Sequence, residues 1–212
     1  MKQVKRFLSV LLTLCMLMGM LPSTVFAVDH SMPFTDVENT DWFYDAVEYA
    51  YDNGIMSGTG DTTFSPDIAT TRGMIVTILH RMEGTPSAAG ANFTDVPRSQ
   101  WYTSAVDWAS ANDIVAGYGN GEFGPNDPIT REQMAAILYR YVQYKEYEHT
   151  ITGDVSTFAD FSQISTYAVE AMSWATGAEL ISGVGNNMLD PTGSATRAQV
   201  AMILMRFCEQ VI

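Results

Sequence analysis

Basic side chains are scarce in this sequence, which has 11 Lys and Arg residues against 24 Asp and Glu residues and a net charge of −13. Nucleic acid is therefore a poor partner, because binding to phosphates requires a basic surface that displaces their counterions. Cysteine is equally rare, and Cys208 is the only one outside an apolar stretch at the N-terminus. The sequence thus excludes an internal disulfide framework in the mature protein.

Recognisable catalytic and metal-binding motifs are also missing. The 3 histidines occupy unrelated positions, no serine lies in a G-x-S-x-G motif, and the loops rich in glycine and aspartate do not match the calcium-loop pattern. Acidic residues are so abundant that a pair of them is no sign of glycoside hydrolysis. The sequence accordingly predicts no enzymatic activity, no cofactor and no metal.

Long apolar runs are confined to the first 27 residues. Three basic residues precede an apolar run over residues 8–21, and small residues follow it up to Ala27. This order predicts a secretory signal peptide over residues 1–27, cleaved after Ala27. As a helix the run would span about 21 Å, short of the roughly 30 Å hydrocarbon core of a bilayer. An uncleaved anchor is therefore the less favoured alternative, and we expect no membrane span after cleavage.

What the sequence does contain is an internal repeat. One shift of the chain places Phe34 on Phe93, and a longer shift places it on Phe158 in a third, more divergent copy. The copies share an F-x-D motif, an aromatic residue, a G-x-G pair and a Thr-Arg pair, in the same order. Repeats of this length stabilise each other by packing together, so we expect one domain with units at residues 34–84, 93–143 and 158–208.

Each unit is predicted to consist of a helix, a loop and a second helix, which makes the fold mainly α. A threonine caps the second helix, and Gln133 and Gln199 complete a capping box in two of the copies, whereas Met74 breaks it in the first. The loop is rich in glycine and proline, and its G-x-G glycines are expected to be turn residues. The residues expected to cap the first helix are Thr40, Ser99 and Ser165.

Six of the basic residues occupy only two positions of the repeat. The later position falls near the end of the second helix, where a cation complements the helix dipole. The residues there are Arg81, Arg140 and Arg206. The earlier position follows the capping threonine, where the same dipole disfavours a cation. The residues there are Arg72, Arg131 and Arg197.

Two interpretations are open for the arginines at the helix starts. They can form salt bridges with carboxylates of a neighbouring unit, for which the candidates are Asp36, Asp95 and Asp160. Alternatively, each arginine and the free backbone N–H groups beside it can clamp a carboxylate or phosphate of a ligand. We favour the clamp, because three cations placed against the dipole call for an anion.

Two further positions are weaker candidates for a binding site. Asp36 and Asp95, in the F-x-D-V motif, can orient an arginine or accept a sugar hydroxyl, or equally form an Asx turn that starts the helix. Trp42 and Trp101 suggest aromatic platforms for a sugar ring, with packing in the core as the alternative.

The repeats resemble S-layer homology domains. The stretch FTDVPRSQWYTSAVDWASANDIVAGYGNGEFGPNDPITREQMAAILYR, residues 93–140, carries the F-x-D-V, tryptophan, G-x-G, F-x-P and T-R motifs in order. The resemblance implies a pseudo-threefold trimer of repeats. It also implies grooves between adjacent repeats that hold a secondary cell wall polysaccharide, commonly one with pyruvate ketals on N-acetylmannosamine. The binding residues it implies are Arg72, Arg131 and Arg197, with Asp36, Asp95, Trp42 and Trp101 as weaker candidates.

The resemblance predicts a secreted protein that attaches non-covalently to the bacterial cell wall. The alternative is a surface-layer module that assembles with copies of itself or with another surface protein and binds no glycan. Two departures from the pattern matter. The usual acidic residue after T-R-x is replaced by Met74, Gln133 or Gln199, and the third copy has Tyr167 for the tryptophan and Leu189 for the loop phenylalanine. We therefore expect the groove of the third copy to be the weakest.

Overall fold

The computed structural model describes residues 32–212, so the predicted signal peptide, residues 1–27, lies outside the described residues. This part of the chain contains α-helices and short 3-10 helices and no strand, which confirms the mainly α class. The α-helices are α2 (Tyr44–Asp52), α3 (Arg72–Met82), α4 (Thr103–Ala111), α5 (Arg131–Tyr144), α6 (Val169–Gly177) and α7 (Arg197–Gln210). The 3-10 helices η2 (Val155–Thr157), η3 (Phe161–Gln163) and η4 (Thr166–Ala168) precede α6. None of these helices has both the length and the apolar character needed to cross a bilayer.

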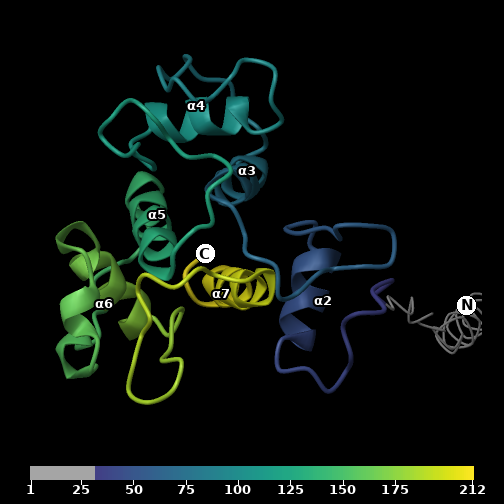
Figure 1. Cartoon of the computed structure of the whole chain (residues 1–212), viewed down its shortest axis with the longest axis vertical. Coiled ribbons are helices and arrows are strands. Elements are labelled where there is room, and N and C mark those ends of the chain that lie inside the picture. The colour runs from purple at the N-terminus through teal and green to yellow at the C-terminus, as the bar shows by residue number, and fades with distance from the viewer. Residues whose placement is uncertain (1–31) are drawn as a thin grey trace, which may run out of the picture. The chain divides into compact units, whose positions relative to one another are not determined.

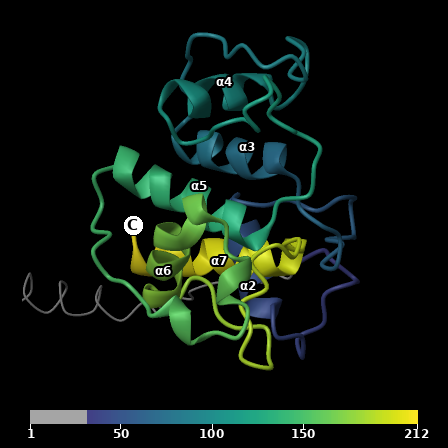
Figure 2. The ribbon, with the colours of Figure 1, turned by 60° about the vertical axis from the view of Figure 1, so that its left-hand side comes forward.

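The helices pack in pairs that join different units. Helix α3 of the first unit packs against α4 of the second, α5 of the second against α6 of the third, and α7 of the third against α2 of the first (Figure 1). The α3–α4 and α5–α6 pairs can also be followed in Figure 2. Because the last pair returns to the first unit, the arrangement closes on itself. The predicted pseudo-threefold trimer of repeats is confirmed.

Three extended segments meet where the inner helices α3, α5 and α7 begin. The N–H of Thr70 donates to the carbonyl of Ala195, that of Ala195 to the carbonyl of Ile129, and that of Ile129 to the carbonyl of Thr70, at 2.8 to 2.9 Å. The three residues are equivalent in the repeat, and each is fully buried. Each hydrogen bond of the ring joins two different units, so the ring forms only when all three units pack together.

One hydrophobic core runs through the three units. Its largest fully buried side chains come from every unit, and they include Phe64, Trp108, Phe123, Tyr141, Trp174 and Phe207. Burying large apolar side chains across the boundaries between units stabilises the trimer by about 25 cal/mol for each Å² of apolar surface removed from water. The trimer of repeats is therefore expected to unfold as one cooperative unit.

The predicted caps are confirmed for the inner helices. Thr130 and Gln133 form a capping box at the start of α5, and Thr196 and Gln199 form another at the start of α7. At the start of α3 the hydroxyl of Thr71 accepts from a backbone N–H without a box. These caps fix where each helix begins and so where each arginine of the T-R motif lies.

The caps predicted for the outer helices are wrong. Helix α4 begins at Thr103 and not after Ser99, because the N–H of Gln100 donates to the Thr103 hydroxyl and closes a turn ahead of the helix. Thr40 likewise lies in a turn before α2, and Ser165 precedes the 3-10 helix η4. The repeated aromatic residue therefore lies in the turn or the 3-10 helix ahead of the outer α-helix, where its side chain can stay exposed.

Candidate functional site: three grooves between the repeats

The arginines of the T-R motif lie beneath the loop of another unit. The Nε of Arg197 donates to the carbonyl of Phe64 at 2.7 Å, and its Nη2 donates to the carbonyl of Ser57 at 2.7 Å. Arg72 donates in the same way to Phe123 and Ala116, and Arg131 to Leu189 and Ser182. The three arginines are only 5 to 7% exposed. Each of these arginines therefore joins its own unit to another unit by two hydrogen bonds.

The backbone N–H groups at the helix starts are occupied too. The N–H groups of Arg197 and Ala198 donate to the carbonyls of Ile68 and Pro66 at 2.9 Å. The equivalent N–H groups of α3 and α5 donate to the carbonyls of Asp127, Pro125, Gly193 and Pro191. The predicted clamp of an anion by free N–H groups is therefore wrong. Carbonyl oxygens of the next unit supply the negative end of the dipole that the helix start requires.

The alternative interpretation, salt bridges from these arginines to the aspartates, is not found among residues 32–212 either, because the aspartates bind backbone instead. Both oxygens of Asp36 accept from backbone, from the N–H of Phe64 at 2.8 Å and the N–H of Ser65 at 2.7 Å. These donors are 28 and 29 residues away, so the Asx turn is wrong. Asp95 and Asp160 hold the loops of their own units in the same way. The aspartate and the arginine thus grip one loop from two units, and we leave Asp36 and Asp95 out of the proposed binding site.

Removing the charge of Asp36 is expected to change how stability depends on pH. Burial raises the pKa of Asp36, but the hydrogen bonds from Phe64 and Ser65 outweigh burial and hold it below its usual range. A lowered pKa in the folded state gives stability that is complete above the unfolded-state value, near pH 4, and is lost as the pH falls through the folded-state value. Asp36→Asn should cost about 1 to 2 kcal/mol at neutral pH, because the carboxylate accepts two backbone bonds.

Urea denaturation at several pH values checks this prediction. The free energy of unfolding of the wild type should fall more steeply than that of Asp36→Asn between about pH 5 and pH 3. The exposed Asp61 provides the control, since Asp61→Asn should behave as the wild type. Parallel pH profiles for the wild type and Asp36→Asn would contradict the assigned role.

The surface is hollowed at three equivalent places between the units. Each groove is lined by an arginine of the T-R motif from one unit, an inner helix with its later arginine from the next unit, and an aromatic residue from the remaining unit. The Arg197 groove, of about 360 Å³, holds Arg197, Arg81 and Trp101. The Arg131 groove, of about 400 Å³, holds Arg131, Arg206 and Trp42. The Arg72 groove, of about 400 Å³, holds Arg72, Arg140 and Tyr167.

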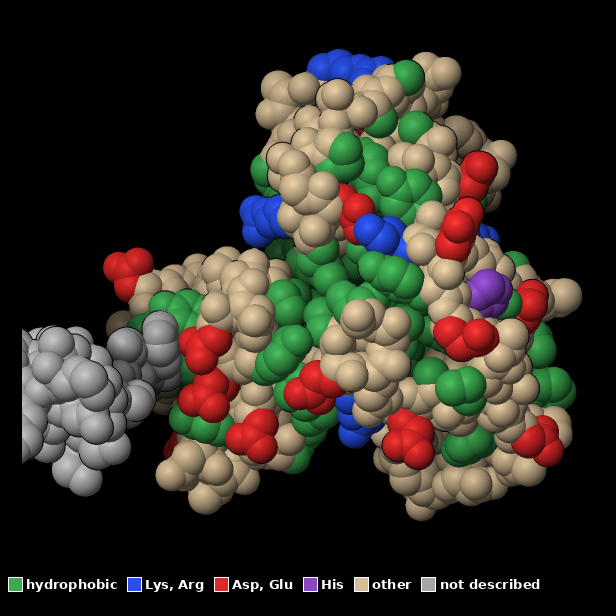
Figure 3. Space-filling view, turned by 180° about the vertical axis from the view of Figure 1, so that it is seen from behind, with side chains coloured by type: hydrophobic (Ala, Val, Ile, Leu, Met, Phe, Trp, Pro, Cys, Tyr) green, Lys and Arg blue, Asp and Glu red, His purple; other side chains and the backbone are tan. Residues whose placement is uncertain are grey.

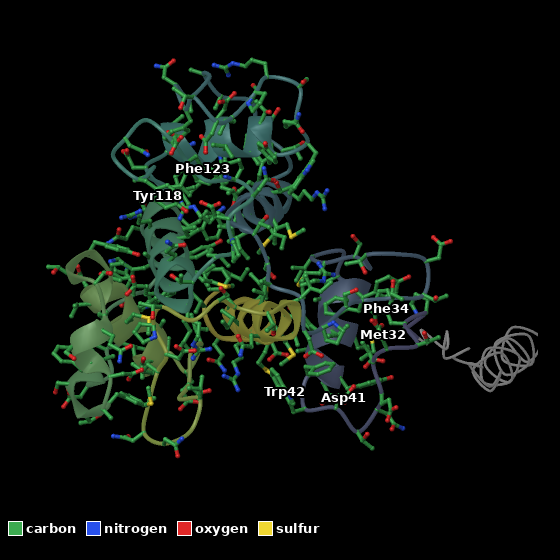
Figure 4. All side chains as sticks on the ribbon, viewed as in Figure 1. Met32, Phe34, Asp41, Trp42, Tyr118 and Phe123 are labelled. Carbon is green, nitrogen blue, oxygen red and sulfur yellow. The ribbon has the colours of Figure 1, made fainter. Side chains whose placement is uncertain are left out.

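The aromatic residues of the grooves are exposed. Trp42, Trp101 and Tyr167 are 63, 56 and 53% exposed, whereas Trp108 and Trp174 are 1% exposed. Figure 4 shows Trp42 in the turn that leads into α2. Packing in the core is therefore wrong as an explanation of Trp42 and Trp101. A large exposed ring beside a concave surface offers a face on which another ring can stack.

Sequence reasoning missed the second arginine of each groove. Arg81 lies in the last turn of α3, as the helix dipole predicts, but Arg140 and Arg206 lie about a turn before their helices end. In two of the three copies the helix dipole therefore does not explain why an arginine stands at this position. The signal that could have found them was their repetition, since a chain with few basic residues has an arginine at this position in all three copies.

The two departures of the third copy fall in different grooves. Tyr167 lines the groove that Arg72 and Arg140 form, whereas the loop with Leu189 covers Arg131. The guanidinium carbons of Arg72 and Arg197 lie 4.7 and 4.4 Å from the ring centroids of Phe123 and Phe64, respectively, and Leu189 cannot provide this cation–π contact. The expectation of one weakest groove for the third copy placed both departures in the same groove, whereas the structure divides them between two grooves.

The grooves concentrate positive charge on an acidic protein. Burial lowers the pKa of Arg72, Arg131 and Arg197, but a guanidinium starts so far above neutral pH that it stays charged. On the face drawn in Figure 3, the few basic side chains lie apart from one another, and acidic ones are spread over the surface. Charges farther apart than about 8 Å are largely screened at physiological ionic strength, so each groove can attract an anion locally.

The chain is similar in sequence to a known domain family and to several bacterial proteins. The profile of the S-layer homology domain matches residues 33–73, 92–135 and 157–201. The chain is 33% identical to an endoglucanase of Bacillus sp. (strain KSM-635) over 208 residues, which are 96% of this chain and 22% of the enzyme. It is 29% identical to the surface-layer 125 kDa protein of Lysinibacillus sphaericus and 25% identical to the S-layer protein of Bacillus thuringiensis subsp. finitimus. Those matches cover 79 and 97% of this chain but only 14 and 24% of the relatives, so it spans less than a quarter of each of these three.

Proposed function

This chain belongs to the S-layer homology domain family, and from that premise we propose that it anchors to the cell wall by binding an anionic, pyruvylated secondary cell wall polysaccharide in its three grooves. Its family and its S-layer relatives make it a secreted protein attached to the cell surface. The anchoring is non-covalent and involves no catalytic step.

The observation that carries the proposal is the threefold recurrence of two arginines and one exposed aromatic residue in a groove. In each groove the later arginine, Arg81, Arg140 or Arg206, reaches the ligand directly. The Nε and Nη2 of the buried arginine donate to carbonyls of the neighbouring loop, and the rest of its guanidinium lines the groove. A carboxylate on a sugar fits between such cations, because charge-assisted hydrogen bonds to carboxylates are about twice as strong as neutral ones.

The aromatic residue supplies the second part of the binding. A sugar ring has an apolar face of C–H groups, and an exposed indole can cover that face while the arginines hold the carboxylate. A volume of about 360 to 400 Å³ falls in the range of small-ligand sites and accommodates one or two sugar residues. A polymer that occupies more than one groove would gain avidity without any additional contact type.

Retention on purified wall polysaccharide tests the proposal. The protein without residues 1–27 should bind the native polysaccharide. Mild acid treatment that removes the pyruvate should lower the retained amount by at least about tenfold, because the groove arginines lose the carboxylate that they bind. Added salt should weaken binding to the native polymer more than binding to the treated polymer. Equal retention on both polymers would refute the proposal that the grooves bind the carboxylate of the pyruvate ketal.

Sedimentation across a dilution series, without polysaccharide, separates this function from the alternative of a self-assembling module. A glycan anchor should remain one species at all dilutions. Ordered oligomers that persist on dilution and ignore added polysaccharide would favour assembly, with the exposed aromatic residues buried between copies.

A further inference from the structure

One buried carboxylate distinguishes the Arg72 groove from the other two grooves. Glu132, at the start of α5, is only 4% exposed, and the residues equivalent to it are Gly73 and Ala198. Its oxygens accept from the N–H of Ser165 at 2.9 Å, the hydroxyl of Ser165 at 2.7 Å and the hydroxyl of Tyr167 at 3.0 Å. The sequence therefore places a negative charge beside the Arg72 groove at a position that is uncharged in the other two copies.

Glu132 also determines what the Tyr167 ring offers a ligand. The phenol donates its proton to Glu132, so only its oxygen lone pairs remain for a groove ligand. Trp42 and Trp101 stand at the equivalent positions and carry an indole N–H, which is a donor only. At the same point of the site, two grooves can present a donor and the third an acceptor.

The remaining carboxylates increase the contrast. Asp95 and Asp127 lie close enough to act electrostatically on Arg72, and the hydroxyl of Tyr118 donates to Asp127 at 2.9 Å. Arg131 has Asp160 and Asp190 near enough to raise its pKa in the same way, and Arg197 has Asp36. Arg72 and Arg131 thus have two carboxylates each and Arg197 has one, and Glu132 adds a further negative charge beside the Arg72 groove.

We propose that Glu132 makes the Arg72 groove a site for a neutral, hydroxyl-bearing sugar, while the Arg197 groove selects the carboxylate-bearing sugar. This rests on the proposed function, since it divides the grooves of one glycan-binding module by ligand charge. A neutral sugar hydroxyl can donate to the Tyr167 oxygen, whereas a carboxylate cannot donate and meets the negative charge of Glu132. One polymer with alternating neutral and acidic sugars could then bind in a defined register.

Nuclear magnetic resonance can observe the grooves separately in the protein without residues 1–27. The indole N–H signals of Trp42 and Trp101 report on the Arg131 and Arg197 grooves, and labelled tyrosine rings report on Tyr167. The probes are the methyl glycosides of N-acetylmannosamine with and without the pyruvate ketal. The pyruvylated probe should shift Trp101 at a concentration at least about tenfold lower than Tyr167, and the neutral probe should not show this preference.

Glu132→Gln tests the cause. Glutamine keeps the shape of the side chain and an acceptor for the hydroxyls of Ser165 and Tyr167, but it removes the charge and the acceptor of the Ser165 N–H. It should lower the concentration at which the pyruvylated probe shifts Tyr167 by about five- to tenfold and leave the neutral probe unchanged. Glu146→Gln, at an exposed position outside the grooves, makes the same change in net charge and should alter neither titration.

The outcomes separate the two proposals. If Tyr167 and Trp101 respond to the pyruvylated probe at one concentration in the wild type, or if Glu132→Gln leaves their ratio unchanged, the division of the grooves is overturned and the glycan anchor stands. If neither probe shifts any of the three reporters, both proposals are overturned. Should Glu132→Gln lower the melting temperature, Tyr167→Phe provides a second test, observed with labelled phenylalanine rings. It removes the phenol oxygen and should weaken binding of the neutral probe selectively.

Discussion

Arg197→Met is expected to be among the most destabilising single substitutions in this protein, at a cost of about 2 to 4 kcal/mol. Methionine retains much of the side-chain volume but leaves the carbonyls of Phe64 and Ser57 without the donors that hold them at 2.7 Å. It also removes a cation that stacks 4.4 Å from the ring centroid of Phe64. For a domain of this size such a loss lowers the melting temperature by roughly 6 to 12 °C, which calorimetry measures directly.

Arg81→Met is the matched control, because Arg81 lies in the same groove and is exposed. It should change the stability by no more than about 0.5 kcal/mol, yet weaken polysaccharide binding. Melting temperatures that fall equally for both variants would contradict the structural role of Arg197. The comparison has a practical consequence, since loss of wall binding in an Arg197 variant does not by itself establish a contact with the ligand.

The fold could be predicted from the sequence to a large extent, for identifiable reasons. Capping boxes are local and chemically specific, so Thr130 with Gln133 and Thr196 with Gln199 marked the starts of α5 and α7 correctly. The order of repeated motifs indicated a trimer of repeats. The outer helices were misjudged, because a serine or threonine before a helical pattern can as well lie in a turn, as Ser99 does ahead of α4.

The site was only half predictable, because its logic is not local. The sequence shows that Arg72, Arg131 and Arg197 are unusual, but their partners are carbonyls 44 to 140 residues away. A carbonyl has no sequence signature, whereas an aspartate does. Sequence reasoning therefore paired each arginine with an anion, when the motifs F-x-D and T-R meet through the backbone of one loop.

A second limit came from assigning one groove to each copy of the repeat. Each groove takes one element from every unit, so a change in one copy alters the groove of another. Tyr167 belongs to the third copy but acts in the groove of Arg72 and Arg140. The sequence of one copy does not show which units share a groove. The packing of α2 against α7, which closes the ring of units, shows it.

The double substitution Trp42→Ala with Trp101→Ala is expected to give the largest loss of binding without loss of stability. Both side chains are more than half exposed, so the free energy of unfolding should change by no more than about 0.5 kcal/mol. Truncating an aromatic residue that anchors a ligand typically costs about 2 kcal/mol, which is roughly thirtyfold in affinity per groove. Because a polymer engages several grooves at once, the loss on intact wall polysaccharide should exceed that of one groove, to about a hundredfold or more.

Calorimetric titration with wall polysaccharide, together with urea denaturation, measures both parts of this prediction. Tyr51→Ala is the control, since Tyr51 is an aromatic residue that is 37% exposed but lines none of the three grooves. Undiminished affinity in a folded double variant would show that the ligand does not stack on these rings, and the grooves would lose the feature that separates a sugar site from a general anion site. A double variant that binds normally but no longer assembles would instead assign the exposed rings to contacts between copies of the protein. Since Arg197 supports the fold and Trp42 and Trp101 do not, the tryptophans, like Arg81, allow binding to be weakened while the trimer of repeats stays intact.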